Sequence, residues 1–259
     1  MITLLNGEEW QEADILKRME DDSFYYGHLG KHALSSSSLK KLLHSPKAYQ
    51  TSLRMSDNSS ALQVGRLVHL AVLEKHKLND LVIINGTKAK KEYKDAVEEH
   101  GEHMVFTESE MTSAYWIADA VHSNAEASYL LNDCNYEVAG VDMIEGLAFR
   151  AKADALTKDG SVIIDLKTTS SDISDFYWSA KKYNYALQAA LYLRIFNAQE
   201  FIFLVVDKNT KDIGIFSCSN DFLEAGSDDI QRGIQVYKNF FMQPNSEELI
   251  KNNVYRGVL

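Results

Sequence analysis

Residues 149–169, with the sequence FRAKADALTKDGSVIIDLKTT, contain two β-prone runs separated by an Asp-Gly pair. Asp-Gly between such runs is a strong hairpin signal, because a two-residue type I′ turn needs positive φ at both central positions. We therefore expect Asp159 and Gly160 to form this turn. Counting outward from it, Leu156 should pair with Ile163 across the two strands.

Two carboxylates and one lysine gather on one side of this predicted hairpin. The same register places Asp154 opposite Asp165, and Lys167 shares the face of Asp165 because alternate side chains of a strand point the same way. Like charges directly opposite each other are destabilising, so the pair favours a bound cation. Mg²⁺ is usually held by one or two carboxylates together with phosphate and water oxygens. The pattern indicates metal-assisted phosphodiester hydrolysis, with Lys167 orienting the nucleophile or neutralising developing charge.

These three residues alone leave an alternative open, namely a surface hairpin with solvated aspartates and a weak lysine ion pair. The rest of the chain favours the catalytic interpretation. Asp154 followed by Asp165-Leu166-Lys167 at the end of an apolar strand resembles the PD-(D/E)xK nuclease superfamily, although Ala153 replaces the family's proline. The strand looks most like that of RecE-type and lambda-exonuclease-like phage exodeoxyribonucleases. Three further segments match in the same order along the chain: an opening helix from Leu34, a Gly-x-x-x-His element at Gly65 and His69, and a Gln-x-x-x-Tyr helix at Gln188 and Tyr192.

Each of these elements also has a physical interpretation of its own. His69 lies in an apolar stretch long enough for a buried helix, where a lone histidine is more often a hydrogen-bonded core residue. The resemblance implies instead that His69 approaches the metal. Gly65 lies one turn earlier on the same face, where the missing side chain lets backbone or substrate come close. Gln188 and Tyr192 are also one turn apart, and the resemblance implies contact with a phosphate or base, whereas Tyr192 alone would be assigned to the core. Glu137 corresponds to an acidic residue that some relatives place near the site, or it is an exposed edge-strand glutamate.

The resemblance implies an α/β fold with a restriction-endonuclease-like core, in which helices flank a central mixed β-sheet. It implies a Mg²⁺-dependent exodeoxyribonuclease, with Mn²⁺ as a substitute, that degrades linear double-stranded DNA 5′ to 3′ and leaves 3′ overhangs. Asp154 and Asp165 would hold the metal with His69 and the Leu166 carbonyl, and Lys167 would position the attacking water. A single-strand annealing protein is the implied partner, and the implied assembly is a ring, trimeric or tetrameric. The alternatives are an endonuclease, a single-strand nuclease, or a noncatalytic DNA-binding protein on this fold.

The net charge of -10 is unusual for a DNA enzyme, but the basic residues are clustered. Phosphate binding needs a positive track, while acidic surface elsewhere keeps a protein soluble. Charged runs are also common on solvated helix faces. We therefore predict DNA contacts only for four lysines, namely Lys40, Lys41, Lys181 and Lys182.

The length of 259 residues suits a single α/β domain. We expect an N-terminal extension of unassigned role at 1–33, a core at 34–217 and a C-terminal helical segment at 218–259. Two cysteines cannot supply an iron-sulfur cluster or a cysteine-rich zinc site, and their scarcity fits a reducing cytoplasm. The chain lacks an apolar run of membrane-spanning length and the features of a signal peptide. We expect a cytoplasmic protein of a bacterial cell, encoded by a phage or prophage.

Capping residues and periodicity predict the remaining elements. Ser35 to Ser38 offer N-caps for a helix toward Leu53, and Ser59 or Ser60 offers one for the helix bearing His69. A capping box at Thr107 and Glu110 starts a helix that should reach about Leu131. Strands are expected near 135–143, 147–156, 161–169, 200–206 and 213–217, and further helices at 183–197 and 221–241.

Overall fold

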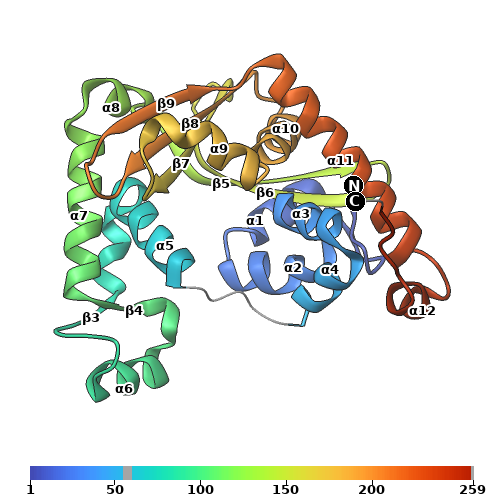
Figure 1. Ribbon diagram of the computed structural model, residues 1–259, viewed down its shortest axis with the longest axis horizontal. Coiled ribbons are helices and arrows are strands. Elements are labelled where there is room, and N and C mark those ends of the chain that lie inside the picture. The colour runs from blue at the N-terminus through green and yellow to red at the C-terminus, as the bar shows by residue number, and fades with distance from the viewer. Residues whose placement is uncertain (55–59, 258–259) are drawn as a thin grey trace.

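A five-stranded mixed sheet forms the centre of the protein (Figure 1). The computed structural model describes residues 1–54 and 60–257. Strands β7 and β8 are parallel, and the other neighbouring strands are antiparallel. The predicted α/β fold with a central mixed sheet flanked by helices is confirmed. In spatial order the strands are β5 (Cys134–Ile144), β6 (Leu147–Thr157), β7 (Val162–Thr169), β8 (Glu200–Asp207) and β9 (Ile213–Ser217).

The β6–β7 hairpin has the predicted register but not the predicted turn. Leu156 pairs with Ile163, as expected from the sequence. Gly160 has a φ of 75°, but Asp159 keeps a negative φ, so the turn is not type I′. The Gly160 N–H donates to the Thr157 carbonyl at 2.8 Å, and the Asp159 carboxylate accepts from the Thr157 hydroxyl at 2.6 Å and the Ser161 N–H at 3.0 Å. These local bonds hold Asp159 in an ordinary conformation, and only the glycine adopts the left-handed one.

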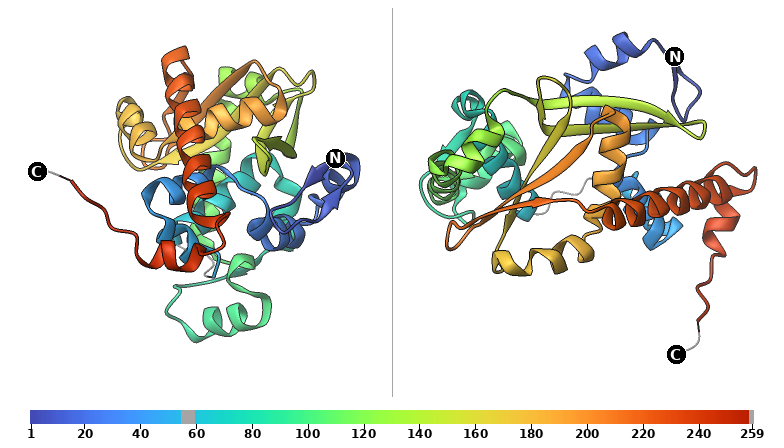
Figure 2. Two further views of the ribbon diagram at one scale, coloured as in Figure 1. Left: turned by 90° about the vertical axis from the view of Figure 1, so that its right-hand side faces the viewer. Right: turned by 90° about the horizontal axis from the view of Figure 1, so that it is seen from above.

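Strands β6 and β7 stay together only near their turn. Their ladder contains the pairs Ala155–Ile164 and Leu156–Ile163, after which β6 continues along β5 and β7 continues along β8. In the right-hand view of Figure 2 the β5–β6 pair and the β7–β8 pair run in different directions. The sheet therefore opens into a fork directly beyond Ala155, and Asp154 and Asp165 are the first residues inside it.

Helices cover this sheet with apolar faces. One core cluster joins α5 (Ser60–Leu73) and α7 (Glu108–Ser123) to β7 and β8, with Leu67, Ile117 and Leu166 among its buried residues. Two further clusters involve the helices α3 (Ser36–His44), α9 (Phe176–Lys182), α10 (Tyr185–Phe196) and α11 (Asn220–Phe241). Burial of these apolar faces fixes the helices that carry His69 and Gln188.

Two helices predicted as continuous are interrupted. The helix expected from Ser35 toward Leu53 divides into α3 and α4 (Pro46–Ser52), because proline forces the preceding Ser45 out of the helical region. Ser45 then caps α4 by accepting from the Ala48 N–H at 3.0 Å. The capping box at Thr107 is confirmed, but α7 ends at Ser123, and Asn124 caps the separate helix α8 (Ala125–Leu131). The predicted N-cap Ser59 lies outside the described residues.

Residues 1–33 pack against the β5–β6 face of the sheet. Ile15 and Met19 are fully buried there in one cluster with Val141 and Ala148. This segment contains β1 (Ile2–Thr3), β2 (Glu9–Trp10), α1 (Glu12–Arg18), the π-helix η1 (Ser23–His28) and α2 (Leu29–His32). Elsewhere the chain forms β3 (Val82–Ile84) and β4 (Val105–Thr107), which pair in parallel, α6 (Lys91–His100), α12 (Ser246–Lys251) and the 3-10 helices η2 (Lys75–Asp80), η3 (Glu102–Met104) and η4 (Ile173–Asp175). None of the helices within 1–54 and 60–257 is long and apolar enough to cross a membrane.

Candidate active site

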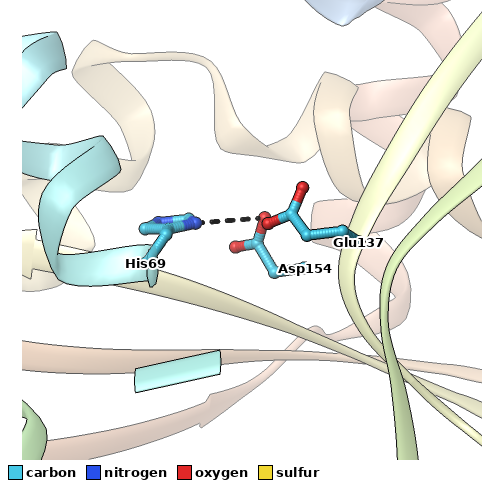
Figure 3. Close-up of side chains that lie close together, drawn as sticks. All are labelled: His69, Glu137 and Asp154. Atoms are coloured by element: carbon cyan, nitrogen blue, oxygen red, sulfur yellow. Dashed lines mark ion pairs between the residues drawn. The ribbon is translucent and has the colours of Figure 1, made fainter. Parts of the chain in front are cut away.

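Three potential metal ligands from three different elements meet at the fork. Figure 3 shows His69 of α5, Glu137 of β5 and Asp154 of β6 pointing toward one another. One ligand atom from each side chain lies within 4.8 Å of the others. The group comprises two carboxylates and one imidazole, which suits a divalent cation.

Asp154 occupies the position where the β6–β7 ladder stops. One of its oxygens, Oδ2, accepts from the Leu166 N–H at 2.8 Å, so the carboxylate replaces a backbone partner at the opening of the fork. The other oxygen, Oδ1, lies 3.5 Å from His69 Nδ1. Burial alone would raise the pKa of Asp154, but His69, Lys167 and the Leu166 N–H together outweigh burial and lower it. Asp154 is therefore ionised at neutral pH.

His69 links the two strands at this point. Its Nε2 donates to the Leu166 carbonyl at 2.9 Å, and a carbonyl can only accept, so Nε2 carries a proton. Burial would lower the pKa of His69, yet Asp154 raises it to about 9, which makes the ring an imidazolium at neutral pH. Two predicted metal ligands, His69 and the Leu166 carbonyl, thus bond to each other.

The buried Asp165 and the half-buried Lys167 form an ion pair beside this group. The Lys167 Nζ lies 2.5 Å from Asp165 Oδ2, and the Gln188 side-chain amide donates to Asp165 Oδ1 at 2.6 Å. Burial raises the pKa of Asp165, and Lys167 opposes this rise. Burial would lower the pKa of Lys167, but Asp165, Asp154 and Tyr185 together more than offset that decrease and raise it. Asp165 is predicted to be a metal ligand, but here its two oxygens are held by Lys167 and Gln188.

Glu137 holds an unusual backbone conformation. The β5–β6 ladder pairs Tyr136 with Ala155 and Val138 with Ala153, but it omits Glu137 and Asp154 between them. Glu137 has a φ of 51°, in the left-handed region that non-glycine residues rarely adopt outside turns. Burial and the Asp154 charge raise the pKa of Glu137 to about 7. Strain of this kind is concentrated at functional sites, so the structure favours the interpretation of Glu137 as a site residue over an exposed edge glutamate.

Lys40 and Tyr185 extend the site toward the surface. The ammonium groups of Lys40 and Lys167 lie 5.2 Å and 5.1 Å from the centre of the Tyr185 ring. Burial and the Lys167 charge lower the pKa of Lys40 to about 8. Lys40, which is predicted to contact DNA, therefore lies beside Lys167. Tyr185 is not among the predicted residues, although it stands three positions before Gln188 and so shares its helix face.

The other predicted substrate contacts lie in different environments. A side chain added at Gly65 would meet open space, which fits the predicted close approach. The ring of the half-buried Tyr192 lies 6.2 Å from that of Phe196 and 6.0 Å from that of Phe201, so it packs at the edge of the core, and its predicted contact with a phosphate or base stays a prediction. The remaining lysines lie near the surface: Lys41 is half-buried on α3, and Lys181 and Lys182 are exposed on α9.

The chain matches the model of one known protein family. Residues 35–247 match the family model described as a PDDEXK-like domain of unknown function, DUF3799. The chain belongs to this PDDEXK-like family. The match covers most of the chain and includes every predicted site residue, and the predicted superfamily is confirmed. None of the curated protein sequences matches the chain.

The chain is also similar, to different degrees, to several solved structures. An exonuclease candidate from Eubacterium rectale is 17% identical, with 92% of this chain and 95% of that chain covered, and superimposes with a TM-score of 0.62. At this level of identity, the likeness shows a shared fold alone. A phage-related exonuclease from Haemophilus somnus 129PT is 13% identical over 81% of this chain and 95% of that chain, with a TM-score of only 0.34. An alkaline exonuclease from Laribacter hongkongensis is 11% identical over 88% of this chain and 100% of that chain, with a TM-score of 0.36.

Proposed function

We propose that this protein is a metal-dependent exodeoxyribonuclease that hydrolyses linear double-stranded DNA. The observation that carries the proposal is the gathering of Asp154, Asp165, Lys167 and His69 at the fork of a PDDEXK-like sheet. Carboxylates that can hold a cation, beside a half-buried lysine that can balance charge on the phosphate, suit metal-assisted phosphodiester hydrolysis.

The donor atoms at the fork fit a hard divalent cation. His69, Glu137 and Asp154 each have one ligand atom within 4.8 Å of the others, and the Leu166 carbonyl adjoins them. Because a histidine binds a metal as a neutral imidazole, His69 would release the proton on Nδ1 when it binds the ion. Asp165 would join this set when its bonds to Lys167 and Gln188 rearrange. A bound Mg²⁺ or Mn²⁺ would polarise the phosphate and lower the pKa of a water molecule.

The protein's own side chains supply the remaining functions. The Lys167 ammonium is held at the carboxylate edge by Asp165 and by the Tyr185 ring, where it can orient a water molecule and balance negative charge on the phosphate. Gln188 fixes Asp165 through its amide. Lys40 contacts the same Tyr185 ring and adds a second cation, which would attract the neighbouring phosphate.

Resemblance to RecE-type enzymes supplies the finer parts of the proposal. Degradation would run 5′ to 3′ and leave 3′ single-stranded overhangs for recombination through an annealing protein. The chain would act in a bacterial cytoplasm, encoded by a phage or prophage, as a trimeric or tetrameric ring. Duplexes labelled at the 5′ or 3′ end test the polarity, because 5′ to 3′ digestion releases the 5′ label first.

Replacement of Asp165 tests the catalytic proposal. Asp165→Asn keeps the size of the side chain and removes its charge, so we expect DNA hydrolysis in Mg²⁺ to fall by about 100-fold or more. Asp207→Asn is the matched control, because Asp207 is a buried aspartate on the neighbouring strand β8 that binds the Asn209 N–H at 2.7 Å. Equal activity of the Asp165 variant and wild type, with both folded by circular dichroism, would contradict the proposal.

Closed circular DNA separates the related activities. An exonuclease leaves closed circles intact and degrades the same DNA after linearisation, whereas an endonuclease cuts both. Wild-type protein that hydrolyses neither duplex nor single strands in Mg²⁺ or Mn²⁺ would instead be a noncatalytic DNA-binding protein.

A further inference from the structure

Helix α9 and the residue after it expose three large aromatic rings. Tyr177 and Trp178 are each 63% exposed, and Tyr183 is 52% exposed. The Tyr177 and Trp178 rings lie 5.2 Å apart, edge to face. Figure 1 shows α9 beside α10, the helix that carries Gln188. Aromatic side chains grouped on a surface mark interaction sites, because water solvates them poorly.

Lysines accompany these rings and connect them to the candidate active site. The Lys182 Nζ lies 5.3 Å from the centre of the Tyr183 ring, and Tyr183 stacks on Tyr185 with 5.9 Å between ring centres and an angle of 29°. Tyr185 in turn contacts Lys167 and Lys40. A series of rings and ammonium groups therefore runs from the exposed Tyr183 to Lys167. Trp178 stands one helical turn before Lys182 and so shares its face of α9. We call these residues together the α9 track, and its members are Tyr177, Trp178, Lys182, Tyr183, Tyr185 and Lys40.

A second exposed aromatic pair shows what is particular to this track. On α7, Tyr115 is 44% exposed and Trp116 is 63% exposed. The sequence of α7, ESEMTSAYWIADAVHS, contains no lysine or arginine, and its charged residues are acidic. Other exposed rings in the described part of the chain stand alone, as at Tyr26, Tyr129 and Tyr255. Of the two helices that expose adjacent rings, α9 combines them with lysines and with contacts that lead to Lys167, and α7 does not.

Rings interleaved with lysines suit one class of ligand. Successive nucleobases of a single strand stack on aromatic side chains while cations follow the phosphates, whereas a duplex hides the faces of its bases. A protein partner with an acidic apolar surface would not need the stacked series to continue inward to Lys167.

We propose that the α9 track binds unpaired nucleobases of a DNA strand beside the active site. Trp178 and Tyr183 stack on bases, and Lys182 and Lys40 contact the phosphates between them. This inference rests on the proposed nuclease function, since it assigns a path to a strand that digestion or fraying has separated from its complement. The strand that enters the site and its complement both offer such bases.

Tryptophan fluorescence tests the track without any hydrolysis. The chain has three tryptophans, Trp10, Trp116 and Trp178. In EDTA, full-length protein is titrated with an oligothymidylate of about 12 nucleotides, within the usual length for one single-strand site. We expect quenching that Trp178→Phe removes almost completely and that Trp116→Phe, the matched control, leaves in place. By fluorescence anisotropy, Trp178→Ala should weaken binding of the labelled oligonucleotide at least about fivefold, with Trp116→Ala unchanged.

Equal quenching in Trp178→Phe and wild type would overturn this inference, and so would single-strand binding that the Trp178→Ala and Tyr183→Ala variants leave unchanged. Duplexes with a 5′ tail and with a 3′ tail distinguish the two sources of unpaired bases, and quenching by neither tail would also overturn the inference.

The same titrations separate this inference from the proposed function. Quenching without Mg²⁺-dependent hydrolysis would support the α9 track and contradict the proposed nuclease function. Absent quenching, together with hydrolysis that Trp178→Ala does not change, would contradict the α9 track alone.

Discussion

At the scale of single residues, Glu137 combines strain with a buried charge. Two non-glycine residues near the β5–β6 hairpin have almost the same left-handed φ, 51° at Glu137 and 50° at Glu145. Glu145 lies at the exposed turn and pairs with Lys238 at 2.7 Å. Glu137 instead faces His69 and Asp154. The two glutamates share a backbone conformation, so a comparison between them isolates the role of the side chain.

Glu137→Gln should weaken metal binding. The substitution removes one anionic oxygen from the three-residue group, so we expect the affinity for Mn²⁺ to fall by about tenfold or more. Isothermal titration calorimetry of the variant and wild type measures this change. Glu145→Gln is the control and should bind Mn²⁺ like wild type. Equal affinities for all three proteins would exclude Glu137 from the metal site.

The same variant should change the pH dependence of stability. Burial and Asp154 raise the pKa of Glu137 from 4.5 to about 7, so between these values the folded protein holds a proton that the unfolded chain has lost. The contribution of Glu137 to stability is therefore complete below about pH 4.5 and is lost as the pH rises through 7. Glu137→Gln removes this loss. In EDTA, the melting temperature of the variant relative to wild type should increase from pH 4.5 to 7, and a constant difference would refute the assigned pKa.

Residue types and spacing predicted most of the candidate site. Asp154, Asp165, Lys167, His69 and Gln188 follow from the hairpin register and the resemblance, and the structure brings them together. The sequence does not decide between the two interpretations of Glu137, because its approach to His69 and Asp154 depends on a left-handed backbone that a glutamate does not signal. Tyr185 was missed because it lies between two lysines from distant parts of the chain, Lys40 and Lys167.

At the scale of elements, the crossing of α10 and α11 positions Gln188. Gly226 of α11 is buried at this crossing, and a Cβ there would collide with the backbone carbonyl of Ala186, two residues before Gln188. The backbone of a helix cannot yield as a flexible side chain does. This glycine therefore sets how closely α11 packs against α10, the helix whose Gln188 binds Asp165.

Gly226→Ala should destabilise the protein and disturb the site. We expect the free energy of unfolding to decrease by about 2 kcal/mol, because overpacking outweighs the better helix propensity of alanine. The activity should decrease in parallel as Gln188 shifts away from Asp165. Gly233→Ala on the same helix is the control, since its Cβ would meet only the end of the Leu39 side chain, at 2.7 Å. Urea denaturation measures both variants, and a smaller loss at Gly226 than at Gly233 would contradict this account.

Sequence periodicity identified the five strands of the sheet but not every boundary. The pairing of Leu156 with Ile163 follows from the spacing around Asp159 and Gly160, which holds for several turn types. The turn type itself depended on side-chain bonds of Asp159. Short elements such as β3 and β4 escaped prediction, because three residues carry little periodicity and their parallel pairing joins segments far apart in the chain.

At the scale of the whole molecule, residues 1–33 behave as part of the core. Ile15 is fully buried against β5 and β6, as Leu191 is within the cluster of α10 and α11. The prediction of one domain that includes this extension has a thermodynamic consequence. A segment that folds with the rest unfolds with the rest.

Ile15→Ala and Leu191→Ala should have similar effects. Each removes a buried aliphatic side chain, which costs about 2–5 kcal/mol. In differential scanning calorimetry we expect a single transition for each variant, shifted to a lower temperature by a comparable amount. A separate early transition in Ile15→Ala, with the main transition unmoved, would show that residues 1–33 unfold independently.

The buried acids at the fork already have cationic neighbours from the protein itself. Lys167 accompanies Asp165, and His69 accompanies Asp154. We therefore expect the polypeptide to reach its shape without an added ion. Under the proposed function, a complex with DNA assembled in a chelator would stay intact until the ion is added, which would start all molecules together and make time-resolved capture of the first cleavage event practical.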